Sequence, residues 1–115
     1  MASSRPSGNL FQMPEPLPAA EVLTPLVESP PLRVERILSS GQTTSPGQWY
    51  DQTEAEWVVL LQGEALLTYG DDARLSMKAG DYVLIPPHTR HRVDYTSQDP
   101  PCIWLAVHFE APTPP

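Results

Sequence analysis

Fifteen prolines in 115 residues are the feature that most restricts the fold of this chain. Proline has no backbone N–H and its ring clashes with the preceding helical turn, so it ends helices. The prolines cluster towards both ends of the chain and between short apolar runs. Few windows of helical length are free of both proline and glycine, and the longer ones carry strand-forming residues. The sequence therefore predicts an all-β chain.

Short apolar runs separated by turn residues predict where the strands lie. The expected strands are 32–38, 56–62, 65–69, 74–77, 82–85, 91–95 and 103–109. Residues 48–51 fit a further short strand, and residues 21–26 fit either a strand or a single helical turn. The run EWVVLLQ at 56–62 is nearly all apolar, which predicts a strand buried on both faces. Many short strands at close spacing are typical of a sandwich or barrel.

Length and local composition predict one domain with loose ends. Residues 1–20 are polar and then proline-rich, which indicates a flexible arm. Residues 21–110 form the expected domain, and residues 111–115 form a loose tail.

Charge and cysteine content exclude several classes of partner. The net charge of −7 would make a nucleic-acid backbone repel the chain, so no nucleic-acid partner is expected. No run of 18 apolar residues and no signal-peptide core is present, which predicts no membrane association. The single cysteine, Cys102, forms no internal disulfide and suits a reducing compartment. We expect a soluble cytoplasmic protein.

Two histidines of the segment PPHTRH and one glutamate are the first candidates for a site. Glu56 opens the most hydrophobic run, so it is either the last solvated residue before burial or a carboxylate pointing into a cavity. His88 and His91 are spaced closely enough to chelate a metal. The structural alternative is a strand end that carries two imidazoles.

The spacing of these residues carries a resemblance to a known family. Glu56-WVVLLQ-Gly63 matches E-x6-G, and Gly80-DYVLI-Pro86-Pro87-His88-TR-His91 matches G-x5-P-x-G-x2-H, with histidine at the second glycine. Together the two segments resemble the motifs of the cupin superfamily over roughly residues 33–109. The likeness is strongest to small single-domain bacterial cupins with an RmlC-like jelly roll. The resemblance implies a double-stranded β-helix, the jelly-roll cupin barrel.

The resemblance also implies a divalent metal inside the barrel. Carried over by position, Glu56 matches the family's glutamate ligand and His91 its second-motif histidine. The family's H-x-H pair has no match, because the corresponding positions are either Tyr50 and Gln52 or Trp49 and Asp51. Asp51 would add a carboxylate ligand and Gln52 a neutral amide oxygen, and such a set accepts Zn, Fe, Mn or Ni. The alternative is a buried, hydrogen-bonded Glu56–His91 pair without a metal.

Other side chains are candidates for lining a pocket. Trp49, Tyr50 and Trp104 are the aromatic residues expected at its mouth, although core packing explains most aromatic residues in the chain. His88 stands in a turn and is expected at the rim. His108, on the strand face shared with Trp104, is interpreted as a packed or surface residue.

Three functions remain open from the sequence. The first is a metal-dependent dioxygenase, isomerase or lyase that acts on a small polar or anionic molecule. The second is a metal-free barrel that binds or senses a small ligand. The third is a structural or partner-binding protein, and a homodimer fits all three. Nucleotide-binding glycine loops, nucleophile elbows and CxxC pairs are absent from the sequence.

Overall fold

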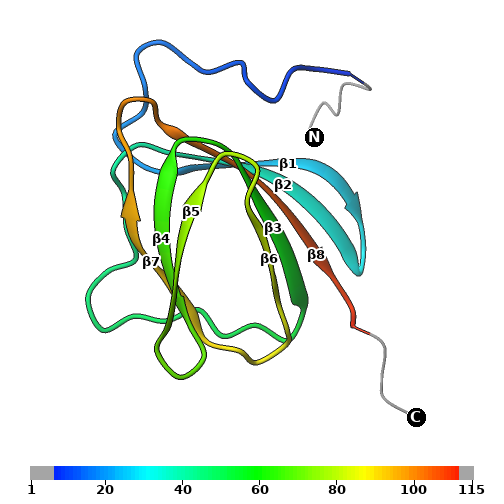
Figure 1. Cartoon of the computed structure of the whole chain (residues 1–115). Helices are drawn as coiled ribbons and strands as arrows, with labels where there is room; N and C mark the ends of the chain where they lie inside the picture. Colours follow the sequence, from blue (N-terminus) through cyan, green and yellow to red (C-terminus); the bar gives the residue numbers. More distant parts are fainter. Residues whose placement is uncertain (1–6, 112–115) are drawn as a thin grey trace.

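A computed structural model describes residues 7–111, and in this range every regular element is a β-strand (Figure 1). Residues 1–6 of the expected arm and 112–115 of the expected tail lie outside the described residues. No helix in the described range is long and apolar enough to cross a membrane.

Antiparallel strands form two sheets that face one another (Figure 1). The strands are β1 (Val22–Ser29), β2 (Leu32–Ser39), β3 (Ala55–Gln62), β4 (Glu64–Tyr69), β5 (Ala73–Lys78), β6 (Tyr82–Ile85), β7 (His91–Thr96) and β8 (Cys102–Phe109). The larger sheet has the order β1-β2-β8-β3-β6 and the smaller one β5-β4-β7. Strands that neighbour each other in space but not in sequence, such as β2 and β8, are typical of a jelly roll. The predicted all-β jelly-roll barrel is confirmed.

Two sequence-based expectations need correction. Residues 48–51 form no strand, because only Tyr50 pairs with β7, through an isolated bridge to His91. Strand β3 is not buried on both faces. Its inward residues Glu56, Val58 and Leu60 are buried, whereas the residues between them are half-buried, because only one face of the sheet meets the other sheet. Residues 22–26 of the ambiguous segment 21–26 belong to strand β1, and Glu21 directly precedes it.

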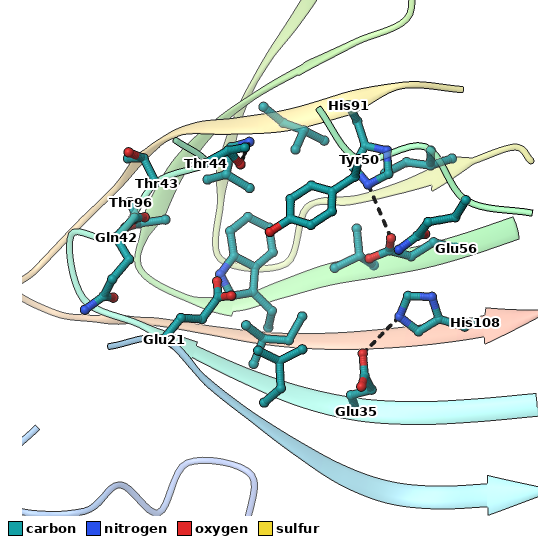
Figure 2. Close-up of a pocket in the computed structure, with 18 residues that line it drawn as sticks. Glu21, Glu35, Gln42, Thr43, Thr44, Tyr50, Glu56, His91, Thr96 and His108 are labelled. Atoms are coloured by element: carbon teal, nitrogen blue, oxygen red, sulfur yellow. Dashed lines mark hydrogen bonds and ion pairs between the residues drawn. The ribbon is translucent and has the colours of Figure 1, made fainter. Parts of the chain in front are cut away.

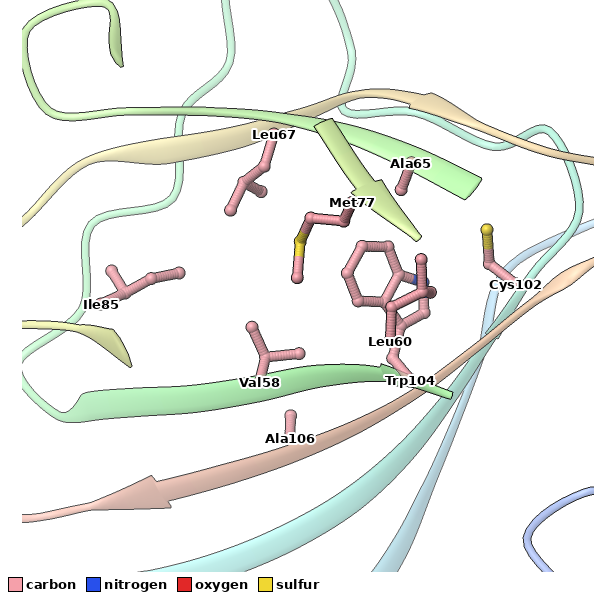
Figure 3. Close-up of a cluster of buried hydrophobic side chains, with 9 residues drawn as sticks. All are labelled: Val58, Leu60, Ala65, Leu67, Met77, Ile85, Cys102, Trp104 and Ala106. Atoms are coloured by element: carbon pink, nitrogen blue, oxygen red, sulfur yellow. The ribbon is translucent and has the colours of Figure 1, made fainter. Parts of the chain in front are cut away.

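The hydrophobic core fills the space between the two sheets (Figure 3). Its buried members are Val58, Leu60, Ala65, Leu67, Met77, Ile85, Cys102, Trp104 and Ala106. Trp104 extends across this core, and its indole Nε1–H donates a hydrogen bond to Ser39 Oγ at 3.0 Å. The bond satisfies the only polar group of a buried indole, which would otherwise be costly to bury.

The segment before β1 is tied to the barrel by side chains of the larger sheet and its following loop. Arg36 Nη1 donates hydrogen bonds to the carbonyl oxygens of Leu10, at 3.2 Å, and of Gln12. Gln42 Nε2 donates to the carbonyl oxygen of Ala19 at 2.8 Å. The described part of the expected arm therefore lies against the domain at these points.

Candidate functional site

A cavity of about 190 Å³ lies inside the barrel, next to the apolar core (Figure 2). Its walls come from both sheets and from the loop between β2 and β3. The lining residues are Glu21, Leu23, Glu35, Ile37, Gln42, Thr43, Thr44, Tyr50, Gln52, Glu56, Val58, Leu67, Ile85, His91, Val93, Thr96, Trp104 and His108. Apolar side chains make up much of the wall, with several carboxyl, imidazole and hydroxyl groups among them. This mixture is typical of a small-molecule site.

The first polar group in the cavity is a pair formed by Glu56 on β3 and His91 on β7. His91 Nε2 lies 3.5 Å from Glu56 Oε1, and the two residues are only 6% and 8% exposed. His91 Nδ1 lies 3.0 Å from the carbonyl oxygen of Thr89, which can only accept a hydrogen bond. Nδ1 is therefore a donor, and Nε2, which faces Glu56, is the nitrogen that gains or loses a proton.

The surroundings of His91 raise its pKa. Burial acts to lower the pKa, but the hydrogen bonds with Glu56 and Thr89 and the negative charges of Glu56 and Asp51 outweigh it. The ring also stacks on Tyr50, with centroids 5.5 Å apart. The direction of this pKa shift means that the pair favours the protonated imidazolium of His91, which is the form that Glu56 stabilises.

A second carboxylate–imidazole pair lies on the neighbouring strands. His108 Nε2 on β8 lies 3.0 Å from Glu35 Oε1 on β2, and both side chains are buried (Figure 2). Arg33 reaches Glu35 at 3.5 Å and Glu54 at 3.4 Å from outside the cavity. Cross-strand pairing sets Glu56 directly opposite His108, so the two pairs share one face of the sheet.

The loop that carries Gln42, Thr43, Thr44, Tyr50 and Gln52 into the cavity is bonded along β7. Thr44 N donates to Val93 O at 2.9 Å, and Tyr50 and His91 exchange two backbone hydrogen bonds. The Arg92 guanidinium donates to the carbonyl oxygens of Thr44, Ser45 and Gln48 at 3.0, 3.3 and 3.1 Å. These contacts hold the loop as a fixed wall.

The Tyr50 hydroxyl and the Glu21 carboxyl are two further ionisable groups of the cavity lining. Burial and the charges of Glu21 and Glu56 raise the pKa of the Tyr50 hydroxyl. Burial and the charge of Glu35 raise the pKa of Glu21, although its side chain remains accessible at the rim. Figure 2 shows Tyr50 extending across the cavity between His91 and Glu21.

The structure brings five of the eight candidate residues together. Glu56, His91, Gln52, Tyr50 and Trp104 all line the cavity. The other three are Trp49, Asp51 and His88, and none of them belongs to its lining.

These three residues lie on the outside of the barrel or at its end. Asp51 Oδ1 and His88 Nδ1 form an exposed pair at 3.0 Å. His88 has a φ of 57°, in the left-handed region that favours glycine, at the position where the motif has glycine. Trp49 packs under Arg90, whose guanidinium carbon lies 4.1 Å from the ring centroid.

Sequence reasoning missed Glu21, Glu35 and His108. A signal for His108 was present, because period-two alternation sets it on the same face of β8 as Trp104, which was expected in the pocket. Glu35 shares a face of β2 with Ile37 by the same rule. Glu21 had no such signal, since its segment was ambiguous between strand and helical turn.

The donor set allows a test of the metal that the resemblance implies. Within residues 7–111, no three His, Cys, Asp or Glu side chains gather in an arrangement that could hold a metal ion. Glu56 and His91 are two sound ligands, and His91 is oriented by Thr89 as metal-binding histidines usually are. Gln52 Oε1, a third donor in the lining, is buried without a hydrogen-bond partner. The residues present therefore fit a site with one carboxylate ligand and two neutral ligands, an imidazole nitrogen and an amide oxygen.

A small antiparallel barrel with acidic and imidazole groups facing an internal cavity defines the class of small jelly-roll barrels. A family model described as the cupin domain matches residues 35–108, and this chain belongs to that family. The expected membership of the cupin superfamily is confirmed.

Solved structures agree with this assignment. A proposed mannose-6-phosphate isomerase from Ralstonia eutropha JMP134 is 44% identical, with a TM-score of 0.85 over 91% of this chain and 98% of that one. A cupin superfamily protein from Desulfitobacterium hafniense DCB-2 is 17% identical, with a TM-score of 0.69 over 90% of this chain and all of that one (100%). The Fe(II) form of HppE is 18% identical, with a TM-score of 0.66 over 77% of this chain and 50% of that one. The two last likenesses concern the fold alone. No curated protein matches the chain.

Proposed function

We propose that this cupin binds a small polar molecule in the barrel cavity and that the His91–Glu56 pair moves a proton on it. The observation that carries the proposal is the burial of this pair in the wall of an open cavity. Burying ionisable groups is costly, so such groups inside a barrel favour a functional site over simple packing. The adjacent Glu35–His108 pair extends the same polar surface.

The geometry gives each residue a role in proton transfer. The Thr89 carbonyl keeps the Nδ1–H of His91 in place, so Nε2 is the atom that exchanges a proton with the bound molecule. Glu56 lies 3.5 Å from that nitrogen and stabilises the imidazolium that results. Apolar residues of the wall, Val58, Leu67 and Ile85, exclude water and so strengthen these electrostatic interactions.

The relative from Ralstonia eutropha suggests isomerisation, which is a proton transfer between neighbouring carbons. This chain supports that type of step, but its cavity does not favour a hexose phosphate. No lysine or arginine side chain of the described residues lines it to hold a phosphate. We therefore assign a small molecule without a phosphate group.

Protein-observed NMR tests this function. A panel of small uncharged, cationic and anionic compounds is titrated against 15N-labelled protein, with the indole N–H signal of Trp104 as reporter. Trp104 lines the cavity and Trp57 does not, so Trp57 is an internal control. Any compound that binds is then incubated in deuterated water, and deuterium at its carbon positions reports proton transfer.

The expected result is binding that shifts the Trp104 signal, and deuterium incorporation that His91→Gln and Glu56→Gln reduce by at least about a hundredfold. Binding with no deuterium incorporation would overturn the proposed proton transfer and would leave a barrel that binds or senses a small ligand. If no compound of the panel shifted Trp104, the proposed function would be wrong.

A divalent metal held by Glu56, His91 and Gln52 is the second candidate. The buried, unpartnered Gln52 Oε1 favours it, because a metal would satisfy this oxygen. When bound, the metal would supply Lewis-acid polarisation of an oxygen on the ligand. Glu56 and His91 would then hold the ion, and Tyr50 and Trp104 would orient the ligand beside it.

Elemental analysis of tag-free protein tests the metal. Near-stoichiometric Zn, Fe, Mn or Ni, lost in both Glu56→Ala and His91→Ala, would establish the site. A rise in melting temperature on adding the metal, absent from both variants, is a readout independent of activity. Wild-type protein that holds no metal and takes up none of the four would rule this candidate out.

A further inference from the structure

The charge of the cavity wall is unbalanced towards the negative. Three carboxyl groups, those of Glu21, Glu35 and Glu56, line it. The only basic side chains in the lining are the two imidazoles, and each is already paired with a carboxylate. No lysine or arginine of the described range lines the cavity. An anionic ligand would meet repulsion here.

Glu21 is the carboxylate without a cationic partner. None of the ion pairs formed among residues 7–111 includes it. Its pKa is raised by burial and by the neighbouring charge of Glu35. The repulsion between the two carboxylates is relieved if a positive charge enters the cavity.

Aromatic and apolar surfaces lie beside this carboxylate. The Tyr50 ring extends across the cavity towards Glu21 (Figure 2). Trp104 is also a lining residue of the cavity. Leu23 and Ile37 line the cavity on the strands next to Glu21. Aromatic faces attract cations, and alkyl substituents of a cation are well accommodated by apolar side chains.

One buried polar atom of a lining residue has hydrogen-bonding capacity left. Gln52 Oε1 is buried and has no hydrogen-bond partner. His108 Nδ1 also makes no hydrogen bond, but it lies 4.0 Å from Glu54 Oε1, so a carboxylate already faces it. Buried polar groups normally find partners, so the orphaned amide oxygen of Gln52 favours a ligand that can donate a hydrogen bond.

We infer that the molecule bound in this cavity is a small organic cation, an alkylammonium ion whose positive charge lies between the Glu21 carboxylate and the Tyr50 ring. This inference rests on the proposed function, since it assigns the charge of the molecule that the same cavity binds. It departs from the anionic ligand that the sequence left open. Glu21 and Tyr50 become the residues that select the ligand, while His91 and Glu56 act on its other end.

The test compares charged molecules with uncharged molecules of the same shape. Choline is paired with its carbon isostere, in which a tert-butyl group replaces the trimethylammonium group, and propylammonium is paired with propanol. Each is titrated against 15N-labelled wild type with the Trp104 indole signal as reporter and a chelator present, so that no metal ion contributes. Glu21→Gln and Tyr50→Leu are the test variants. Glu28→Gln, an exposed residue of β1 outside the lining, is the matched control.

The expected result is that at least one ammonium ion binds about tenfold or more tightly than its uncharged partner, as a charge-assisted contact provides. Glu21→Gln should remove that preference, Tyr50→Leu should reduce it several-fold, and Glu28→Gln should leave it unchanged. Equal binding of both members of each pair, or a preference that survives Glu21→Gln, would overturn the inference. Binding of uncharged or anionic panel compounds without any ammonium ion would also overturn it, while the proposed function would stand. If no compound of the panel shifted the Trp104 signal, both this inference and the proposed function would be wrong.

Discussion

At the scale of the residue, Gly63 is a position where both the backbone conformation and the close neighbouring atoms disfavour any side chain. It joins β3 to β4 with a φ of 96°, a conformation that side chains rarely adopt. A Cβ at this position would lie 2.8 Å from Ser97 Oγ and 2.9 Å from the Cα of Cys102. Gly63→Ala is therefore expected to lower the free energy of unfolding by about 3 kcal/mol, from backbone strain and overpacking together.

Gly47 is the matched control for this prediction. Its φ is 78°, but a Cβ there would meet nothing within 4 Å. Gly47→Ala should cost only the backbone term of about 1 kcal/mol. Urea unfolding followed by tryptophan fluorescence measures both values, and equal losses in the two variants would contradict the role of close packing at Gly63.

At the scale of the element, Arg92 connects strand β7 to the loop that forms one wall of the cavity. Its planar guanidinium reaches three carbonyl oxygens, and a lysine ammonium would not match that arrangement. Arg92→Lys should therefore speed hydrogen exchange at the Thr44 and Tyr50 amides by about tenfold, which corresponds to roughly 1.4 kcal/mol of lost protection. Arg90→Lys is the control, because Arg90 contacts the face of Trp49. Unchanged exchange in Arg92→Lys would mean that the backbone bonds alone hold the wall.

The hydrogen bond from Thr68 on β4 to the Asp94 carboxylate on β7 predicts a dependence of stability on pH. The hydrogen bond from Thr68 Oγ1 lowers the pKa of Asp94; burial opposes this, and Arg92, 2.8 Å away, lowers it further. A carboxyl whose pKa is lower in the folded state contributes stability above its unfolded pKa of about 3.9 and loses it as the pH falls through the folded value. Asp94→Asn should cost at most about 1 kcal/mol at pH near 7, because the carboxyl is only half-buried and water screens its interactions.

The same difference should vanish in acid. Urea unfolding at a pH of about 7 and again below the folded pKa of Asp94 measures it, with Asp71→Asn, an exposed turn residue, as the control. A gap between Asp94→Asn and wild type that persisted in acid would show that the contribution is steric and not ionic.

These elements also show how far the sequence leads. Alternation and turn residues located β2 to β8 to within one residue at each end, because their side chains face either the core or water. The exception is 48–51, where the pairing partner of Tyr50 is a residue of β7 far away in sequence. Glu56 and His91 were found through motif spacing. Glu35 and His108 were missed because their partnership is set by the pairing of β2 with β8, which no local pattern encodes.

At the scale of the whole molecule, the homodimer expected from the sequence stays a prediction. Strand β1 is at the edge of the larger sheet and carries exposed Leu23, Leu26 and Val27. An edge strand with exposed apolar side chains is suited to antiparallel pairing with an identical strand. Light scattering should then give twice the chain mass, and Val27→Lys should shift it towards the monomer, whereas Thr24→Lys on the same strand should shift it less. A monomeric wild type at micromolar concentration would contradict the expectation.

The segment before β1 links the outside of the molecule to the cavity. Its carbonyl oxygens at Leu10 and Gln12 accept from Arg36, and that of Ala19 accepts from Gln42, whose side chain lines the cavity. Removing residues 1–20 takes away all three acceptors, and water would replace them only in part. The expected loss is about 1 kcal/mol of unfolding free energy, or roughly 5 °C in melting temperature for a domain of this size.

Removing residues 1–6 alone leaves these three contacts in place, so this shorter truncation is the control and should keep the part of the melting temperature that they contribute. Arg36→Gln distinguishes the contributions of the two ends of the segment. It disturbs the contacts at Leu10 and Gln12 and leaves the bond from Gln42 to Ala19 in place. If the bond from Gln42 to Ala19 holds the cavity rim, removing residues 1–20 should also shift the Trp104 indole signal. Arg36→Gln should lower the melting temperature but leave the Trp104 signal unchanged. A 1–20 truncation that melts as the full chain does would mean that the segment contributes neither stability nor order to the cavity.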